Sequence, residues 1–411
     1  APQEAGGTRH FELGRYCAER GDEFLVLASD VSYLSGQAAV GRPRWEEFDG
    51  VRVRWLRMPQ WLHRSFLSRV VCFLYFMVKS IFVGIAQSKN VDVVIGTTPP
   101  LFQAFSALVV AKFRRRPLVL EVRDLWPDFA VDMGILNSKV LIALARWLER
   151  LLYRNAAHIV VNSPAYIDHI VAKGVERSRI TLVPNGVDAE MFDPDAQGEH
   201  VRSRYDLQDK FVVTYAGAIG PANDLPTVVS AAELLRHDSS VHILIVGDGK
   251  NRSQVEAQAE QLGLTNITFA GALPKNEMPE VLAASDACLA ILMNIPMFSM
   301  TYPNKVFDYM AAGRPTILAI DGVIREVVEA AEAGIFVEPG NPQAICDAVV
   351  RLKGDSEERL AMGRSARAYV GEHFDRREQA KLFRELLHAI ATDGTFDADA
   401  AMQTPQQITA G

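Results

Sequence analysis

Cysteine is scarce in this sequence, and its few copies are scattered. The 411 residues include four cysteines, which are too few for the disulfide framework of a small secreted protein. None belongs to a Cys-x-x-Cys pair or to a Cys/His cluster with zinc-ligand spacing. The sequence therefore excludes disulfide-rich scaffolds and zinc modules, and we expect core thiols in a reducing compartment at Cys17, Cys72, Cys288 and Cys346.

The chain also lacks an excess of positive charge. Its 43 Lys+Arg and 50 Asp+Glu residues give a net charge of −7, which excludes nucleic-acid binding by bulk electrostatics. The basic residues are unevenly placed, because residues 42–116 contain 13 of them against 4 acidic residues. With 49% apolar residues, a chain of this length can bury the cores of two or three domains.

Short apolar runs alternate with helical stretches along the whole chain. Runs rich in Val, Ile and Leu that are separated by helices are what a parallel sheet buried on both faces requires. In the first half we expect strands at 24–28, 51–56, 91–95, 118–122, 158–161 and 180–183. In the second half we expect them at 211–216, 241–246, 267–270, 287–291, 316–319 and 335–337. The pattern predicts an α/β fold with two Rossmann-like domains that face a central cleft.

The polar stretch 185–198 breaks this alternation and is typical of a linker between domains. No apolar run precedes the loop-like residues 1–7, so we expect the first strand of the N-terminal domain to be missing. The predicted parts are an N-terminal domain at 1–195, a C-terminal domain at 196–375, a helix at 376–392 and a disordered tail at 393–411.

Glycine-rich loops follow several of the predicted strands or precede helices. They occur at Gly6-Gly7, at Gly217–Gly220 and at Gly247-Asp248-Gly249. In open α/β sheets ligands bind beyond the carboxyl ends of the strands. Glycine there permits close backbone approach, and the next helix presents its positive N-terminus to phosphate. Each loop alone is a weak signal, because such turns also occur for steric reasons alone.

The segment 302–315 (YPNKVFDYMAAGRP) is more specific. Pro303 and Asn304 can start a helix, which places Lys305 and Asp308 on one face of its first turns. A cation and an acceptor there suit a nucleoside diphosphate, with Lys305 on phosphate and Asp308 on ribose hydroxyls. The alternative is a solvated ion pair between these two side chains.

This segment resembles the donor-site helix of retaining GT-B glycosyltransferases in the large fourth sequence family. The closest resemblance is to bacterial transferases for O-antigen, capsule or exopolysaccharide. Four further segments resemble family motifs in the right order, namely 4–10 (EAGGTRH), 121–127 (EVRDLWP), 183–188 (VPNGVD) and 246–249 (VGDG). The resemblance covers about residues 1–390 and implies the GT-B fold.

The chain departs from the family at two places. Two glutamates often stand eight positions apart around the donor helix, but here they are replaced by Met300 and Asp308. Many members also carry an Arg and a Lys after the first C-domain strand, where this chain has Pro221, Ala222 and Asn223. We therefore expect Lys305 to supply most of the positive charge.

The donor site implied by the resemblance is otherwise formed by small and polar residues. Lys250 or Arg252 would assist Lys305, and Asn223 would contact the donor unless it or Asp224 only caps the next helix. The predicted donor residues are Gly6, Gly7, Gly217, Asn223, Gly247, Lys250, Lys305 and Asp308.

The acceptor side is predicted at the end of strand 118–122. Asp124 would orient the acceptor or assist its deprotonation, with Lys305 as the second catalytic residue. The alternative is a carboxylate held by Arg123 or Arg9 without a chemical role. Arg9 and His10 begin a helix beside Gly7, and we place both on the acceptor side with Arg123, although either can simply cap.

The sequence thus predicts a retaining hexosyl- or N-acetylhexosaminyl-transferase that uses a nucleotide-sugar, with UDP as the expected nucleotide. The resemblance implies front-face attack, in which Lys305 and helix N-termini stabilise the leaving diphosphate. Two alternatives are a UDP-sugar 2-epimerase on the same fold and a non-catalytic nucleotide-sugar-binding partner of an envelope assembly complex. An epimerase would need carboxylates and histidines that converge on the sugar, and the sequence shows no such cluster.

We expect neither a metal nor another cofactor. Asp193-Pro194-Asp195 looks like the Asp-x-Asp that holds a divalent metal in other transferase folds. It lies in the predicted linker, where a solvated turn is the ordinary explanation. The expected partners are the nucleotide-sugar and a membrane glycan acceptor, such as one linked to polyprenyl diphosphate, and no nucleic acid.

Residues 61–86 predict a helix that associates with a membrane. Arg69 and Lys79 interrupt the apolar run, so a spanning helix is disfavoured. An interfacial helix accommodates both cations at anionic headgroups while an aromatic face that includes Phe73 and Phe76 enters the lipid. Together with the basic segment 42–116, this predicts a cytoplasmic protein that is peripheral on the inner face of the plasma membrane.

Overall fold

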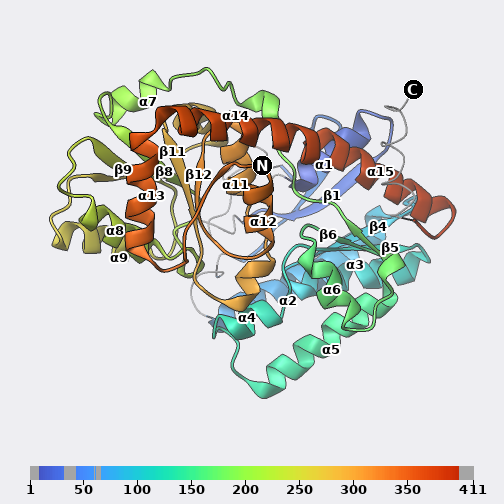
Figure 1. Ribbon diagram of the computed structural model, residues 1–411. Coiled ribbons are helices and arrows are strands. Elements are labelled where there is room, and N and C mark those ends of the chain that lie inside the picture. Colours follow the sequence, from blue (N-terminus) through green and yellow to red (C-terminus); the bar gives the residue numbers. More distant parts are fainter. Residues whose placement is uncertain (1–8, 32–42, 60, 62–65, 398–411) are drawn as a thin grey trace, which may run out of the picture. The chain divides into compact units, whose positions relative to one another are not determined.

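The structure, a computed structural model, describes residues 9–31, 43–59, 61 and 66–397. The chain forms two compact units, which are coloured by sequence in Figure 1. One unit consists of Gly7–Pro184 with the segment from Arg377 onward, and the other contains Asn185–Arg376. We call them the N-unit and the C-unit and describe each by itself.

The N-unit contains two hydrogen-bonded sheets. The parallel sheet has the order β4-β5-β6-β7, with strands Val94–Thr98, Leu118–Val122, His158–Val161 and Ile180–Leu182. The smaller sheet has the order β1-β3-β2, with strands Phe24–Ser29, Val51–Leu56 and Trp45–Phe48. The prediction missed β2, which pairs antiparallel with β3, because four residues with two glutamates carry little strand pattern.

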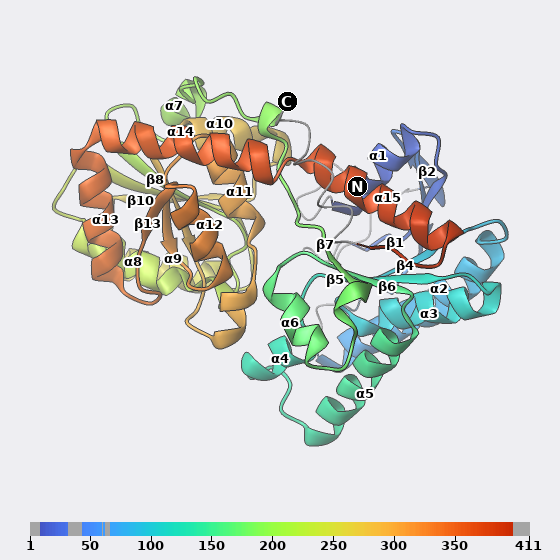
Figure 2. The same cartoon turned by 45° about the vertical axis from the view of Figure 1, so that its right-hand side comes forward.

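In the described part of the N-unit, six α-helices precede residue 184. They are α1 (Arg9–Ala18), α2 (Phe66–Gln87), α3 (Leu101–Arg114), α4 (Asp128–Asp132), α5 (Lys139–Asn155) and α6 (Ala165–Val171). Helix α3 packs against both α2 and α5 and is drawn between them in Figure 2. The short α4 follows β5 directly, so it continues the loop in which Arg123 and Asp124 were predicted to act.

The C-unit contains one six-stranded parallel sheet of order β10-β9-β8-β11-β12-β13. Its strands are β8 (Phe211–Ala216), β9 (Val241–Val246), β10 (Ile267–Gly271), β11 (Ala287–Ile291), β12 (Thr316–Ala319) and β13 (Gly334–Phe336). The helices are α7 (Glu199–Arg204), α8 (Leu225–Leu234), α9 (Arg252–Gln261), α10 (Met278–Ala283), α11 (Asn304–Ala311), α12 (Val323–Ala330), α13 (Pro342–Gly354) and α14 (Ser356–His373). Helices on both faces bury β8, β9 and β11 almost completely, as the apolar runs predict.

The chain enters the C-unit earlier than the predicted boundary at residue 195. Val187 and Phe192 lie in the C-unit core beside α11 and α14. The Val187 N–H also donates to the Phe374 carbonyl, 2.9 Å away. These contacts assign 185–195 to the C-unit, because apolar residues inside the polar stretch are buried there.

The last helix, α15 (Arg376–Thr392), packs in the N-unit. Its residues Ala380, Phe383, Leu386 and Ile390 share one core with Leu13 and with strands β5 and β6. The segment after it was predicted to be disordered from 393, yet the Phe396 ring packs edge-on against His158. Residues 398–411 lie outside the described residues.

Helix α2 has two different sides. Among the described residues, Ser68–Gln87 is the one helical stretch that is long and apolar enough to cross a membrane by length and composition. Cys72, Phe76 and Ser80 are buried on one side of it, and Gly84 lies close to Val110 of α3. The predicted lipid-facing role of Phe76 is therefore wrong, because its spacing places it on the side that packs against the N-unit.

Candidate active site

Helix α11 presents a half-buried lysine at the end of strand β8. The Lys305 Nζ donates to the Tyr215 hydroxyl, 2.8 Å away, and lies 4.0 Å from the centre of the same ring. Burial lowers the pKa of Lys305 to about 7, because a desolvated ammonium is disfavoured. The alternative of a solvated ion pair does not describe Lys305, whose amine contacts a tyrosine among the described residues.

The glycines beside Lys305 leave room for this arrangement. A Cβ at Gly217 would lie 2.8 Å from the Lys305 Nζ, so any side chain there would displace the amine. A Cβ at Gly247 would lie 1.8 Å from the Gly217 carbonyl oxygen. Both residues have positive φ. Their absence of side chains thus brings the β8 and β9 loops together and keeps space open at Lys305.

The remaining predicted donor residues differ in how far other contacts already engage their side chains. Asp308 lies one turn after Lys305 on α11. Asp224 accepts from the Thr227 hydroxyl at 2.7 Å, so the local hydrogen bond at the start of α8 (Leu225–Leu234) belongs to Asp224 and not to Asn223. Lys250 is exposed, whereas Arg252 pairs with Glu256 at 2.7 Å and is less available to a ligand.

Two tyrosines that the sequence did not single out make contacts at this end of β8. Besides accepting from Lys305, the Tyr215 hydroxyl donates to the Ala218 carbonyl at 2.7 Å. The Tyr309 hydroxyl accepts from the Ala216 N–H at 2.8 Å and joins α11 to β8. Both side chains are fully buried. A tyrosine in an apolar strand or helix looks like a core residue, so no sequence signal distinguishes these two.

In the N-unit, the hydrogen bonds of the Arg9 side chain stabilise the fold. Its Nε donates to Glu121 at 2.7 Å, and its two terminal nitrogens donate to the carbonyls of Pro184 and Val183 at 2.7 and 2.8 Å. The side chain is 8% exposed. The predicted acceptor-side position of Arg9 is therefore corrected to a structural tie between α1, β5 and the end of the N-unit chain.

Glu121 is the central residue of this cluster, and the sequence analysis missed it. Its second oxygen lies 2.5 Å from the His10 Nε2 and accepts from the Thr97 hydroxyl at 3.1 Å. Burial opposes ionisation, but His10 and Arg9 hold the pKa of Glu121 well below its usual range. The carboxylate thereby fixes the His10 ring, which remains partly exposed, at the start of α1.

Arg123 and Asp124 follow β5, and their side chains are less engaged in contacts with the rest of the fold than those of Arg9 and Glu121. The buried Nε of Arg123 has no hydrogen-bond partner among the described residues. Desolvation raises the pKa of Asp124 to about 6, although Arg123 opposes the shift. The alternative in which Arg9 holds Asp124 is wrong, because Arg9 binds Glu121. A carboxyl with this pKa exchanges its proton near neutral pH, which is what a base in the reaction requires.

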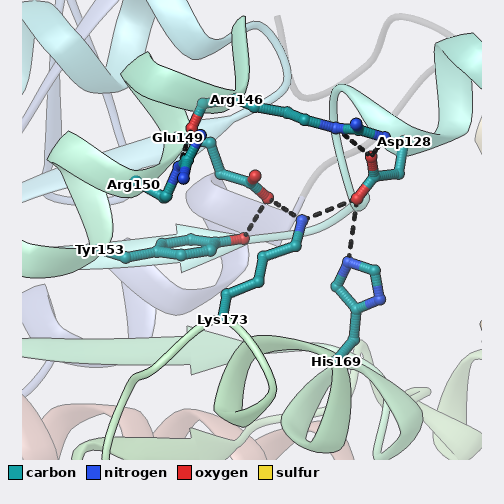
Figure 3. A network of polar contacts seen from close by, with 7 residues as sticks. All are labelled: Asp128, Arg146, Glu149, Arg150, Tyr153, His169 and Lys173. Atoms are coloured by element: carbon teal, nitrogen blue, oxygen red, sulfur yellow. Dashed lines mark hydrogen bonds and ion pairs between the residues drawn. The ribbon is translucent and has the colours of Figure 1, made fainter. Parts of the chain in front are cut away.

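A polar network lies directly beyond this loop (Figure 3). The Lys173 Nζ contacts Asp128 of α4 at 2.7 Å and Glu149 of α5 at 2.6 Å. Asp128 also binds Arg146 and His169, at 3.0 and 3.2 Å. Asp128, Glu149 and His169 are close enough to share a metal ion, but the Lys173 ammonium already joins the two carboxylates. The network is best described as a set of ion pairs that binds α4, α5 and α6 together.

The remaining predicted features are the first glycine-rich loop and the Asp-x-Asp motif. Gly6 and Gly7 lie outside the described residues. In the predicted linker, an Asp193 carboxylate oxygen accepts from the Asp195 N–H at 3.0 Å, as expected of a turn in which the aspartate bonds its own backbone.

Two family models match the two parts of the chain. Residues 199–369 match the model described as Glycosyl transferases group 1. Residues 5–186 match the model described as Glycosyl transferase 4-like domain. The boundary between the two matches falls close to the passage from the N-unit to the C-unit at Pro184.

Several curated relatives and solved structures resemble most of the chain. A colanic acid biosynthesis glycosyl transferase, WcaI, of Escherichia coli (strain K12) is 26% identical over 81% of this chain and 85% of its own. A GDP-mannose-dependent alpha-mannosyltransferase of Mycobacterium tuberculosis (strain CDC 1551 / Oshkosh) is 25% identical over 81% of this chain and 80% of its own. The structure of Anabaena HepE with UDP and glucose has a TM-score of 0.72 at 18% identity, covering 94% of this chain and 98% of that one.

Proposed function

Because the chain is a glycosyltransferase of the GT-B type, we propose that it transfers a hexosyl or N-acetylhexosaminyl group from a UDP-sugar. The proposed acceptor is a lipid-linked glycan of cell-envelope polysaccharide synthesis. The name of the WcaI relative, which refers to colanic acid biosynthesis, supports an envelope polysaccharide. The transferase names of the relatives disfavour the epimerase and the non-catalytic partner.

The single observation on which the donor proposal rests is the position of the Lys305 amine. Lys305 is a half-buried cation whose amine hydrogen-bonds only to Tyr215 among the described residues, beside glycines that keep space open at the end of β8. A diphosphate that reaches this amine would supply the anionic partner that the fold does not. HepE was solved with UDP and with UDP-glucose, which supports UDP as the nucleotide.

For the chemistry we propose retention of configuration without a metal. In this mechanism Lys305 and the N-terminus of α11 (Asn304–Ala311) stabilise the charge that develops on the leaving diphosphate. The test of metal independence is transfer after treatment with EDTA. Unchanged turnover supports the proposal, whereas loss of turnover with rescue by one divalent metal would overturn it.

On the acceptor side we propose that Asp124 orients the reacting hydroxyl or accepts its proton. We also propose that Arg123 binds an anionic or polar group beside it. The raised pKa of Asp124, about 6, supports proton exchange near neutral pH. The orphaned Nε of Arg123 is a buried donor that a ligand oxygen could satisfy. His10, fixed by Glu121, is the third proposed acceptor-side contact.

We also propose that the protein is cytoplasmic and peripheral on the inner face of the plasma membrane. The outward side of α2 (Phe66–Gln87) supports this location, because Leu74, Val78 and Phe82 are exposed there, Phe82 by 71%. The Lys79 amine donates to the Arg57 carbonyl and lies over the Tyr75 ring. The informative variant is Val78→Ser with Phe82→Ser, which should weaken flotation with anionic vesicles.

Two experiments test the proposed function. A thermal-shift screen of UDP-, GDP- and TDP-sugars should give its largest shift with a UDP-sugar, because a ligand bound to the native state raises stability by mass action. Release of UDP from that sugar when membranes are supplied would then show turnover. A shift with GDP-sugars alone would overturn the choice of nucleotide, and binding without UDP release would favour the non-catalytic partner.

A further inference from the structure

Helix α5 (Lys139–Asn155) exposes large apolar side chains on its outer face. Val140, Leu144 and Trp147 are 68%, 56% and 58% exposed, and Leu141 beside them is 45% exposed. Positions 140, 144 and 147 follow the helical period, so their side chains form one stripe. On an ordinary surface helix that stripe would be polar.

This stripe is not the side of α5 that packs against the N-unit. Glu149, Leu152 and Tyr153 form the buried side, which the network of Figure 3 joins to α4 and α6. The helix therefore has two apolar-bearing sides, and the N-unit core accounts for one of them. A contiguous exposed stripe of this kind marks an interaction surface.

The charges around the stripe indicate what it binds. Lys139, Arg150 and Arg154 are exposed along one edge of the helix, together with Arg146, which is already paired with Asp128. Glu149 is the only acidic residue of α5, and it is buried and paired with Lys173. The outer face thus presents apolar groups and cations with no exposed acidic side chain of the helix.

An anionic lipid surface fits this face better than a second copy of the chain. Two copies that met through this stripe would bring their arginines together, and like charges repel. Headgroup phosphates would instead pair with the arginines while the aliphatic side chains entered the acyl region. Trp147 suits this depth, since tryptophan prefers the interface between headgroups and hydrocarbon.

The network also connects this face to the proposed acceptor loop. Arg146 of α5 binds Asp128, which lies four residues after Asp124 in the chain. Lys173 of the α6 end binds both Asp128 and Glu149. Because these contacts are ion pairs with short distances, α5 and the Asp124 loop are held as one body inside the N-unit.

We propose that the outer face of α5 is a docking surface for anionic lipid bilayers and that it fixes the height of the Asp124 loop above the bilayer. The surface is separate from the outward side of α2. The proposal rests on the proposed function only in that the acceptor is lipid-linked, since docking itself needs no acceptor.

The first test is flotation with vesicles of phosphatidylglycerol and phosphatidylcholine, and with phosphatidylcholine alone, at low and high salt. Leu144→Ser with Trp147→Ser should reduce partitioning into the anionic vesicles at least tenfold. The matched control is Val350→Ser with Leu360→Ser, two equally exposed apolar residues of the C-unit, which should float like the unmodified protein. Equal flotation of all three proteins would overturn the proposal.

The second test locates Trp147 directly. Anionic vesicles that contain brominated acyl chains should quench tryptophan emission in the unmodified protein, and Trp147→Phe should lose most of that quenching. Arg150→Gln with Arg154→Gln should abolish the preference for anionic over neutral vesicles. Quenching that is unchanged in Trp147→Phe, or a concentration-dependent dimer that the Leu144→Ser and Trp147→Ser changes break, would contradict lipid docking by α5.

Nucleotide binding separates this inference from the proposed function. The α5 variants should keep the thermal shift with UDP, which also shows that they are folded. Lipid docking without any nucleotide binding would overturn the proposed function alone. Nucleotide binding with flotation that does not depend on α5 would overturn this inference alone.

Discussion

Each unit holds a cation that is at least partly removed from solvent, Arg9 in the N-unit and Lys305 in the C-unit, and the two have opposite kinds of partner. Arg9 in the N-unit binds a carboxylate and two carbonyl oxygens. Lys305 in the C-unit contacts a tyrosine hydroxyl and ring. A buried charge is tolerated when it is paired, so Arg9 is a completed structural contact. Lys305 has no anionic partner among the described residues, and a phosphate group would supply one.

The same contrast separates the acids of the N-unit. Glu121 is fully buried and ionised between Arg9 and His10. Asp124, three residues later, is desolvated, and no cation of the described part of the chain forms a hydrogen bond or ion pair with it. The two carboxylates at the end of β5 therefore differ: Glu121 stabilises the fold, whereas Asp124 is the one proposed to act in the reaction. The variants below are chosen to break one side of this comparison at a time.

The largest effect is expected from Glu121→Gln, because it leaves the Arg9 charge buried and without its carboxylate. Removal of one partner of a buried pair costs about 3–5 kcal/mol, which urea unfolding measures. The control Thr97→Val loses one neutral hydrogen bond to Glu121 and should cost about 1 kcal/mol.

The pH dependence of the same variant gives a second check. The pKa of Glu121 is held well below its usual range, so its stabilising effect is present at neutral pH and is lost as the pH falls into the acid range. The stability difference between the unmodified protein and Glu121→Gln should narrow on acidification. Equal stability of the two proteins at pH 7 would contradict the structural role.

Lys305→Ala should abolish most transfer while the protein stays folded. One preorganised group that stabilises a developing negative charge contributes about 2.7–4 kcal/mol, or a rate factor of ~10²–10³. Steady-state UDP release measures the loss, with Lys381→Ala, at an exposed lysine of α15 in the N-unit, as the control. Near-normal turnover of Lys305→Ala would refute the donor-site assignment.

Asp124→Asn should lower turnover about 100-fold, at the lower end of what a proton-transfer group contributes. Nucleotide affinity should not change. Since the pKa of Asp124 is about 6, its basic form accumulates as the pH rises through 6, and the rate should rise with it. The variant should lack this rise, and Asp132→Asn on α4 should keep it. An identical pH profile in Asp124→Asn would remove Asp124 from the chemistry.

The smallest effect is expected at Asp308. Asp308→Asn should weaken UDP binding about tenfold, as expected for loss of one hydrogen bond to a charged group, and Asp308→Glu should be tolerated. Calorimetry of UDP binding measures both. An unchanged dissociation constant in Asp308→Asn would reject the ribose contact.

The sequence predicted the alternation of strands and helices and the position of Lys305, because both depend on local patterns that a single chain displays. It could not predict Tyr215 and Glu121, since a tyrosine or a glutamate inside an apolar strand shows no sign of its partners. Arg9 was misplaced for the same reason, as its carboxylate is 112 residues away. Phe76 was assigned to the wrong side of α2 because an apolar helix with two such sides has no unique inward direction.

The central claim is that Lys305 binds the diphosphate of the donor. Titration calorimetry of UDP at pH 8 tests this claim most directly. Burial lowers the pKa of Lys305 from the usual 10.5 to about 7. At pH values between these two, the Lys305 amine of the protein without UDP is therefore mostly neutral. Binding of an anion that restores the ammonium should therefore take up a proton. Measured in two buffers of different ionisation enthalpy, the unmodified protein should take up close to one proton per UDP, and Lys305→Ala should bind weakly with none. Equal affinity and equal proton uptake in the two proteins would contradict the account.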